Sequence, residues 1–137
     1  MKRLILDQEA FALSSIMERI TGAHVKDCFK DEETIYFVVR VGELGRAIGK
    51  GGINIRRVQN ELGKRVKIIE YRDNAVDFVR NVIYPASVEE IVEENNGIVI
   101  KDSSRKTKSI LIGRGGKNLK MINRAVSRFF NKEVRVV

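Results

Sequence analysis

Cysteine and histidine are nearly absent from this 137-residue sequence, which holds one of each, Cys28 and His24. A lone cysteine excludes a disulfide within the chain, and one cysteine with one histidine cannot form a cysteine/histidine metal cluster. The sequence therefore also offers few residues for nucleophilic or acid–base catalysis. A base–nucleophile pair of His24 and Cys28, with Asp27 nearby, is the enzymatic alternative, but their position on a short strand favours a structural role. We therefore expect a protein that is not an enzyme, with no catalytic residue, no metal ligand and no cofactor.

Long apolar runs are missing as well, and the longest span only a few residues, such as Ile98–Ile100. No stretch approaches the roughly 20 residues that cross a bilayer as a helix. The N-terminus becomes acidic at Asp7, which is too early for a secretory signal peptide. These absences predict a soluble, cytoplasmic protein with no membrane partner. Apolar residues still make up 43% of the chain, which is enough for folded cores and excludes a disordered chain.

A seven-residue phrase rich in glycine occurs twice. The first copy runs from Ile48 to Asn54 (IGKGGIN), and the second runs from Ile112 to Asn118 (IGRGGKN), 64 residues later. The length alone suggests one domain. The repeat instead predicts two small domains, residues 1–72 and residues 73–137.

Basic residues cluster around both copies of the phrase. Residues 40–72 hold nine Lys or Arg and three acids, and residues 101–128 hold nine and one, in a chain of net charge +8. A positive field focused on two glycine loops indicates a polyanionic ligand, although a solvated basic surface is the simpler alternative. The acids gather elsewhere, as at Glu89–Glu94. That segment is either a surface for a protein partner or, more simply, an edge strand whose charges deter aggregation.

The same order of helices and strands is predicted around each copy, from apolar periodicity and from capping residues. In the first half, the expected elements are a helix at 7–21, strands at 24–29 and 34–41, helices at 42–48 and 53–62, and a strand at 64–71. In the second half, they are a helix at 74–84, strands at 87–94 and 98–102 joined by an Asn-Gly turn, helices at 104–112 and 117–130, and a strand at 132–137.

Alternation assigns faces to two strands of the first half. The strand at 24–29 places Val25 and Phe29 on one face and Cys28 on the other. The strand at 34–41 places four residues on one face, namely Ile35, Phe37, Val39 and Val41.

The closing strands of the two halves match at an offset of 68 residues, four more than the phrases do. Four residues make about one helical turn. We therefore expect the extra residues to lengthen the last helix, which is predicted to run from Lys117 to Phe130.

Three kinds of phosphate-binding loop compete to explain the phrase. A nucleoside-triphosphate loop needs four residues between its glycines and a hydroxyl after the lysine. Gly45 and Gly49 are separated by only three, and Gly51 follows Lys50. A dinucleotide loop would need glycine where Asn54 stands. What remains is a Gly-x-x-Gly turn between two helices that precede a strand, the arrangement of the KH class of RNA-binding modules.

The residues of the phrases suit an RNA strand. Glycine lets the backbone turn sharply and approach a phosphate closely, and the following helix offers N–H groups and the positive end of its dipole. Aliphatic residues beside the loops would form the bottom of a groove for unstacked bases, and basic residues would face phosphates. Glycines that only cap helices are the alternative. The predicted RNA-binding residues are Ile48, Gly49, Lys50, Gly51, Gly52, Ile55, Arg56 and Arg57 in the first copy, and Ile112, Gly113, Arg114, Gly115, Gly116, Lys117, Leu119 and Lys120 in the second.

Both loops resemble those of KH domains, and the helix and strand that precede each core resemble the type II arrangement. The whole chain, including Ile20–Cys28 ahead of the first core, is similar to the short archaeal form of the NusA family of transcription factors. This resemblance implies an α+β fold of two tandem type II KH domains, each a three-stranded sheet covered by three helices. It also implies a protein that binds single-stranded RNA on nascent transcripts and takes part in transcription termination or antitermination.

The resemblance implies RNA polymerase or a transcription complex as a further partner, and we expect a monomer. Bacterial members also have an N-terminal polymerase-binding region and an S1 domain, and neither fits within this sequence, so a polymerase contact of the bacterial kind is not expected. Proteins with two KH domains also act in ribosomal RNA processing and ribosome assembly, and the sequence does not separate that role from transcription. We expect the more basic second loop to contribute more of the electrostatic affinity.

Overall fold

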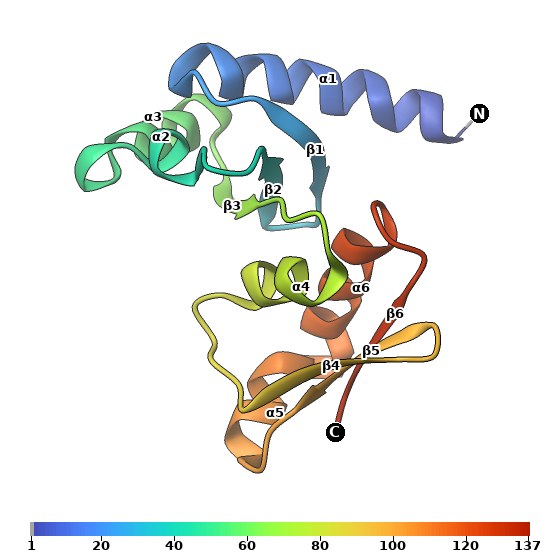
Figure 1. Cartoon of the computed structure of the whole chain (residues 1–137). Coiled ribbons are helices and arrows are strands. Elements are labelled where there is room, and N and C mark those ends of the chain that lie inside the picture. The colour runs from blue at the N-terminus through green and yellow to red at the C-terminus, as the bar shows by residue number, and fades with distance from the viewer. Residues whose placement is uncertain (1) are drawn as a thin grey trace. The chain divides into compact units, whose positions relative to one another are not determined.

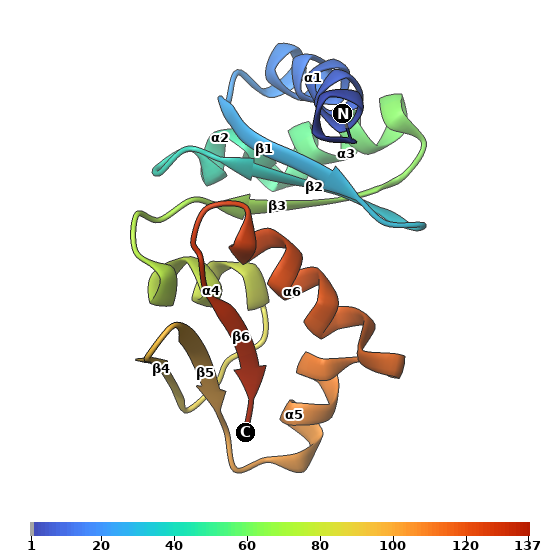
Figure 2. The same cartoon turned by 90° about the vertical axis from the view of Figure 1, so that its right-hand side faces the viewer.

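The structure is a computed structural model that describes the backbone of residues 2–137 and the side chains from Gln8 onward. The chain divides into two units, residues 1–71 and residues 72–137. Each unit contains one three-stranded sheet, and its helices pack on one face of that sheet (Figures 1 and 2). The two units repeat the same order of helices and strands.

The first unit begins with a long helix and ends with a strand. Its elements are α1 (Lys2–Thr21), β1 (Val25–Lys30), β2 (Thr34–Val39), α2 (Leu44–Ile48), the 3-10 turn η1 (Lys50–Gly52), α3 (Ile53–Leu62) and β3 (Arg65–Glu70). β1 and β2 are antiparallel, whereas β2 and β3 run parallel. A parallel pair needs a crossover connection, and α2 and α3 provide it.

The core of the first unit lies between its sheet and its helices. Ile35, Phe37 and Val39, the alternate residues of β2, form one buried cluster with Met17 of α1 and Val58 of α3. A buried aliphatic or aromatic side chain contributes about 1.5–3 kcal/mol to folding. This cluster therefore fixes α3, the helix that follows the first glycine loop, against the sheet.

The second unit has the same topology. Its elements are α4 (Ala75–Ile83), β4 (Glu90–Glu94), β5 (Gly97–Lys101), α5 (Arg105–Ile112), the 3-10 turn η2 (Arg114–Gly116), α6 (Lys117–Ser127) and β6 (Glu133–Val136). β4 and β5 are antiparallel and are joined at Asn95 and Asn96, as the Asn-Gly turn predicts, and β5 and β6 run parallel. The core again consists of side chains from the sheet and the helices, including Phe78, Ile98, Ile100, Leu111 and Ile122.

Most predicted elements are present, with bounds that differ by a few residues. α3 spans the predicted residues 53–62. α1 begins at Lys2 instead of Asp7, and β4 begins at Glu90 instead of Ser87. β2 ends at Val39, and Val41 is 55% exposed instead of sharing the buried face of the strand. The chain leaves the sheet there because it turns at Gly42, which has a φ of +84°.

The predicted faces of β1 are partly wrong. Cys28 lies in the core cluster, and Phe29 stacks on Tyr36 with ring centroids 4.9 Å apart, so these two neighbours point to opposite faces as expected. Val25, however, packs against the same core as Cys28. The register shifts between Val25 and Asp27. This bulge reverses the alternation, because the extra residue moves every earlier side chain to the other face.

The prediction that α6 continues to Phe130 is wrong. α6 ends at Ser127, so it has 11 residues against the 10 of α3. Most of the additional length lies in the connection at 128–132, which replaces the two-residue connection Gly63–Lys64 of the first unit. Phe129 and Phe130 pack against Phe78 there, with ring centroids at 5.4 Å and 5.8 Å. Phe129 and Phe130 are half-buried, so this connection packs against the core of the second unit instead of extending a helix.

None of the helices within residues 2–137 is long and apolar enough to span a bilayer.

Candidate nucleic-acid interface

The two glycine loops have the same backbone conformation. Gly49, Gly51 and Gly52 have φ values of 78°, 63° and 78°. The second loop repeats these values as 76°, 64° and 77°, at Gly113, Gly115 and Gly116. Residues with a Cβ atom rarely adopt such angles, so the conformation explains why all three positions of each loop are glycine.

The first glycine of each loop is packed against an asparagine. Gly49 has φ 78° and ψ 166°, a combination that is essentially restricted to glycine. A Cβ atom at Gly49 would lie 2.8 Å from Cγ of Asn54, and one at Gly113 would lie 2.8 Å from Cβ of Asn118. The loops therefore require glycine here for two independent reasons, the backbone angle and the lack of space.

Asn54 and Asn118 also close the turn by hydrogen bonding. Nδ2 of Asn54 donates to the carbonyl of Arg46 at 2.8 Å, and Nδ2 of Asn118 donates to the carbonyl of Leu111 at 3.0 Å. Each bond satisfies a carbonyl near the end of the first helix of the pair, where helices leave such groups unpaired. The sequence prediction missed both residues, although the identical seventh position of the two phrases was a signal for them.

A cation lies at the tip of each loop. Lys50 and Arg114 are exposed, and neither forms an ion pair with the part of the chain that the structure describes. A Cβ atom at Gly51 or Gly115 would meet nothing within 4 Å, so the backbone beside each cation faces open space. The first turns of α3 and α6 follow directly. Cation, bare backbone and helix N-terminus thus converge, which is suitable for a phosphate.

The remaining predicted basic residues differ between the loops. Nη1 of Arg56 donates to the carbonyl of Gly51 at 2.7 Å, so Arg56 supports the first loop from within the chain. The residue at the same place in the second copy is Lys120, which is exposed. Arg57 and Lys117 are exposed as well. The second loop therefore has a cation available where the first loop has a structural brace.

The four aliphatic residues that are predicted to form a groove for bases are half-buried. They are Ile48, Ile55, Ile112 and Leu119. Ile55 also packs against the core of the first unit. α2 contacts β3, and α5 contacts β6, so the helix that leads into each loop packs beside an edge strand of its own sheet. Half-buried aliphatic side chains next to a charged loop form a surface on which unstacked bases can lie.

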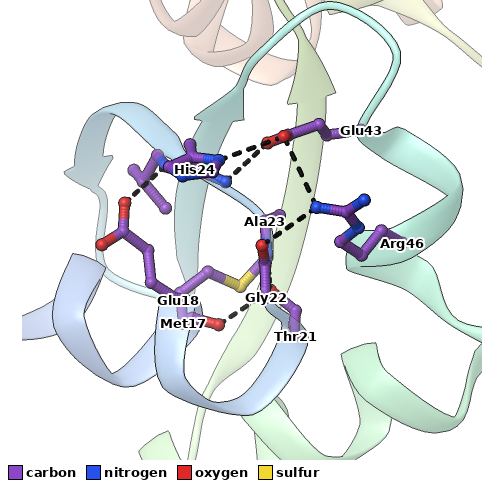
Figure 3. A network of polar contacts seen from close by, with 9 residues as sticks. Met17, Glu18, Thr21, Gly22, Ala23, His24, Glu43 and Arg46 are labelled. Carbon is purple, nitrogen blue, oxygen red and sulfur yellow. Dashed lines mark hydrogen bonds and ion pairs between the residues drawn. The ribbon is translucent and has the colours of Figure 1, made fainter.

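A polar network joins the start of α2 to the end of α1 (Figure 3). Glu43 accepts from the backbone N–H of His24 at 2.6 Å and contacts Nδ1 of the same residue at 3.1 Å. Arg46 of α2 lies 3.7 Å from Glu43 and donates to the carbonyl of Gly22 at 3.4 Å. Because α2 leads directly into the first loop, this network helps to position the loop.

The network also changes the acidity of its central carboxylate. The pKa of Glu43 lies below its ordinary value, chiefly because the backbone N–H of His24 donates to the carboxylate, then through the His24 side chain and the charge of Arg46. The charged form of Glu43 is therefore the form that the folded chain favours.

In the second unit, other residues hold the helix that leads into the glycine loop. Ser104 caps α5 by accepting from the N–H of Thr107 at 3.1 Å. Oγ of Ser103 donates to Glu89 at 2.6 Å, and the N–H of Glu89 donates to Asp102 at 3.0 Å. The approach to the second loop is thus held by hydroxyl and carboxylate groups without an arginine.

Two of the three acids of β4, Glu93 and Glu94, are paired within the second unit. Glu93 lies 2.6 Å from Lys132, and Glu94 lies 3.6 Å from Lys101 and 3.5 Å from Arg135. These ion pairs favour the structural explanation of the acidic segment over a surface for a protein partner.

The arrangement of His24 and Cys28 favours structural roles for both. Cys28 is 4% exposed within the core cluster, whereas the ring of His24 is at the surface beside Glu43. No group of three or more His, Cys, Asp or Glu side chains that could hold a metal ion occurs within the described residues.

Comparisons with known proteins agree with this geometry. A family model of the KH domain matches residues 13–87, which include the first phrase. The chain is 35% identical over 127 residues to the probable transcription termination protein NusA of Methanococcus vannielii, covering 90% of this chain and 72% of that protein. It is 31% identical over 131 residues to the protein of the same name from Halococcus morrhuae, covering 94% of each. The crystal structure of APE1850 matches with a TM-score of 0.75 at 33% identity, covering 95% of this chain and 99% of that one.

Replacing Gly49 by alanine should destabilise the chain, because the new Cβ atom meets Asn54 and the backbone angle is unfavourable. We expect Gly49→Ala to lower the free energy of unfolding by about 1–3 kcal/mol, measured by urea denaturation with circular dichroism. Gly45→Ala is the matched control, since Gly45 is helical and its Cβ atom would meet nothing within 4 Å. That change should raise stability by roughly 0.5–1 kcal/mol, and equal effects of the two substitutions would contradict the packing argument.

The Glu43 network should make stability depend on pH. Because the pKa of Glu43 is lowered from 4.5 in the folded chain, its contribution is fully present above pH 4.5 and is lost as the pH falls through the lower folded value. The urea midpoint of the parent should therefore exceed that of Glu43→Gln at pH 7, and the two should converge as the pH falls through the lowered pKa of Glu43. Glu61→Gln, an exposed position on α3, serves as the control. A difference between parent and Glu43→Gln that stays constant with pH would refute this account.

Proposed function

Because the chain belongs to the KH-domain family and to the archaeal NusA-like proteins within it, we propose that it binds single-stranded RNA through its two glycine loops. The observation that carries the proposal is the convergence, at each loop, of an exposed cation, a backbone without side chains and the first turn of a helix. A KH loop of this kind clamps about four nucleotides. The function is binding, and no catalytic step is assigned to any residue.

We further propose that both units are type II KH domains, with the boundary near residues 72 and 73. The identical strand order, the identical order of elements and the matching loop angles support this assignment for the second unit. Two loops would then hold roughly twice the four nucleotides that one loop holds. The predicted binding residues of the two copies keep their roles, with Arg56 acting mainly through the loop that it braces.

The RNA would be a nascent transcript, and the process would be termination or antitermination of transcription. The names of the relatives from Methanococcus vannielii and Halococcus morrhuae support this role over ribosome assembly. We place the protein in the cytoplasm, where it would act as a monomer near RNA polymerase or another part of the transcription complex.

Disrupting the loops should weaken RNA binding. We expect Lys50→Asp with Gly51→Asp to weaken affinity for a random single-stranded RNA, and Arg114→Asp with Gly115→Asp to weaken it more. The reason is that Arg56 beside the first loop already donates to the carbonyl of Gly51, whereas Lys120 stands at that place in the second copy. The slope of log affinity against log salt should fall by about 0.7 for each phosphate that the variant no longer neutralises. Affinity is measured by fluorescence anisotropy over a salt series, and circular dichroism checks that each variant is folded.

Arg80→Asp is the control for a change of net charge, because Arg80 is exposed on α4 and lies outside the phrases. If the folded variant with both loops changed binds RNA as well as the parent does, the loops are not the binding site.

Crosslinking in cells should recover nascent messenger transcripts bound to this protein. The reason is that the relatives carry the name of a transcription termination protein, so the RNA held at the loops would be the transcript that is being made. Sequencing of the crosslinked RNA measures the outcome, and the variant with both loops changed provides the background. Recovery of mainly precursor ribosomal RNA would instead support a role in ribosome assembly.

A further inference from the structure

An open polar basin lies on the second unit, along α6 and the connection that follows it. Its volume is about 530 Å³. Three cations line it, Lys120, Arg124 and Lys132, and so do three amides, Asn96, Asn123 and Asn131. Ser127 and Glu133 complete the lining. All of these residues have polar side chains, and three of them are cationic against one carboxylate, so the basin is suited to an anionic ligand.

Hydrogen bonds hold the walls of the basin in place. The side-chain amide of Asn123 donates to the carbonyl of Val134 at 2.9 Å and accepts from its N–H at 2.7 Å, which ties α6 to β6. Lys132 is anchored by Glu93 at 2.6 Å. Two of the lining side chains, Asn123 and Lys132, are therefore held in place before a ligand binds, which reduces the entropy lost on binding.

A row of cations connects the basin with the second glycine loop. Lys117, Lys120 and Arg124 are spaced by three and four residues, so they lie on one face of α6. Lys117, Lys120 and Arg124 are all exposed. At 1.5 Å per residue the row covers about 10 Å of the helix. Its first member follows the loop directly, and its last two members line the basin. A strand that leaves the loop would thus meet positive charge all the way to the basin.

The first unit differs at each of these positions. Ile53, Arg56 and Asn60 stand where the second unit has its row of cations, and Arg56 donates to the carbonyl of Gly51. The connection Gly63–Lys64 replaces the longer connection at 128–132 that carries Asn131 and Lys132. Because the first unit builds its loop without these features, the loop does not require them, and they need a separate explanation.

We propose that the basin and its row of cations bind the sugar–phosphate backbone of RNA beyond the nucleotides held at the second loop. This inference rests on the proposed RNA-binding function. Lys120, Arg124 and Lys132 would face phosphates, because cations that neutralise phosphates release the counterions of the RNA. The amides, Ser127 and Glu133 would face the ribose, whose 2′-hydroxyl both donates and accepts hydrogen bonds. The second unit would then bind a longer stretch of RNA than the first.

The test uses the full chain with the first loop disabled by Lys50→Asp and Gly51→Asp, so that the second unit dominates binding. Affinity is measured for an RNA of about four nucleotides, the length that one loop clamps, and for an RNA of twice that length. In this background the longer RNA should bind more tightly. Adding Arg124→Gln and Lys132→Gln should weaken the longer RNA about tenfold at 0.15 M salt and lower its salt slope by about 1.4, since each neutralised phosphate contributes about 0.7.

The short RNA should be unaffected by the Arg124 and Lys132 changes. The control is Arg19→Gln with Arg80→Gln, which removes the same charge from exposed sites on α1 and α4 and should leave both affinities unchanged. A gain-of-function variant, Ser127→Lys, adds a cation to the basin and should tighten the longer RNA only. It keeps the inference testable if the change at Lys132 disturbs the pairing with Glu93.

The outcomes separate the inference from the function on which it rests. If the longer RNA keeps its advantage in the Arg124 and Lys132 variant, or if Ser127→Lys has no effect, the basin does not bind RNA, whereas the loop function is judged separately from the short RNA. If changing Arg114 and Gly115 leaves binding of the short RNA intact, the proposed loop function itself is wrong. Equal effects of the control and of the basin variant would show that only net charge matters, which also overturns the inference.

Discussion

Each glycine loop depends on a backbone that is packed against the side chain of an asparagine. Gly49 and Gly113 adopt angles that other residues avoid, and their Cα atoms leave no room for a Cβ beside Asn54 and Asn118. The asparagine amide then satisfies a carbonyl at the end of the preceding helix. This one arrangement sets the angle between the two helices of each pair. It also places the tip cation, the bare glycine backbone and the next helix N-terminus on the same side, so the chemistry of the loop follows from its packing.

The position of each loop depends on the position of the helix that precedes it. In the first unit, Glu43 joins the backbone of His24 to Arg46, and the short helix α2 is thereby attached to the end of α1. In the second unit, a serine cap and the pair of Glu89 and Ser103 take this place. The same loop geometry is thus supported by unrelated side chains. The constraint acts on the position of the helix, and any set of polar contacts that holds it there is sufficient.

The sequence predicts the order of elements well because each element has its own local signal, such as the alternation of Ile35, Phe37 and Val39 or the Asn-Gly turn between the first two strands of the second half. What it does not predict depends on pairing between distant segments. The bulge in β1 places Val25 and Cys28 in the same core, and it is set by the register with β2 and not by the residues of β1 alone. The four additional residues of the second copy mostly form a connection because Phe129 and Phe130 find a partner in Phe78. The brace from Arg56 to Gly51 likewise forms only when the turn is built.

The two halves of the chain have the same net charge, but their basic side chains make different contacts. Residues 1–72 contain 14 Lys or Arg and 10 Asp or Glu, and residues 73–137 contain 12 and 8, so each half has a net charge of +4. In the first unit, however, Arg46 and Arg56 donate to carbonyls of their own chain, at Gly22 and Gly51. The second copy has Ile110 and Lys120 at those places, and its loop is closed without an arginine. A guanidinium that already donates to a carbonyl must give up that bond, or share it, to bind a phosphate, which reduces its net contribution to affinity. Under the proposed function, net charge alone would therefore not set the affinity of a unit for RNA, because the partners of each cation matter as well.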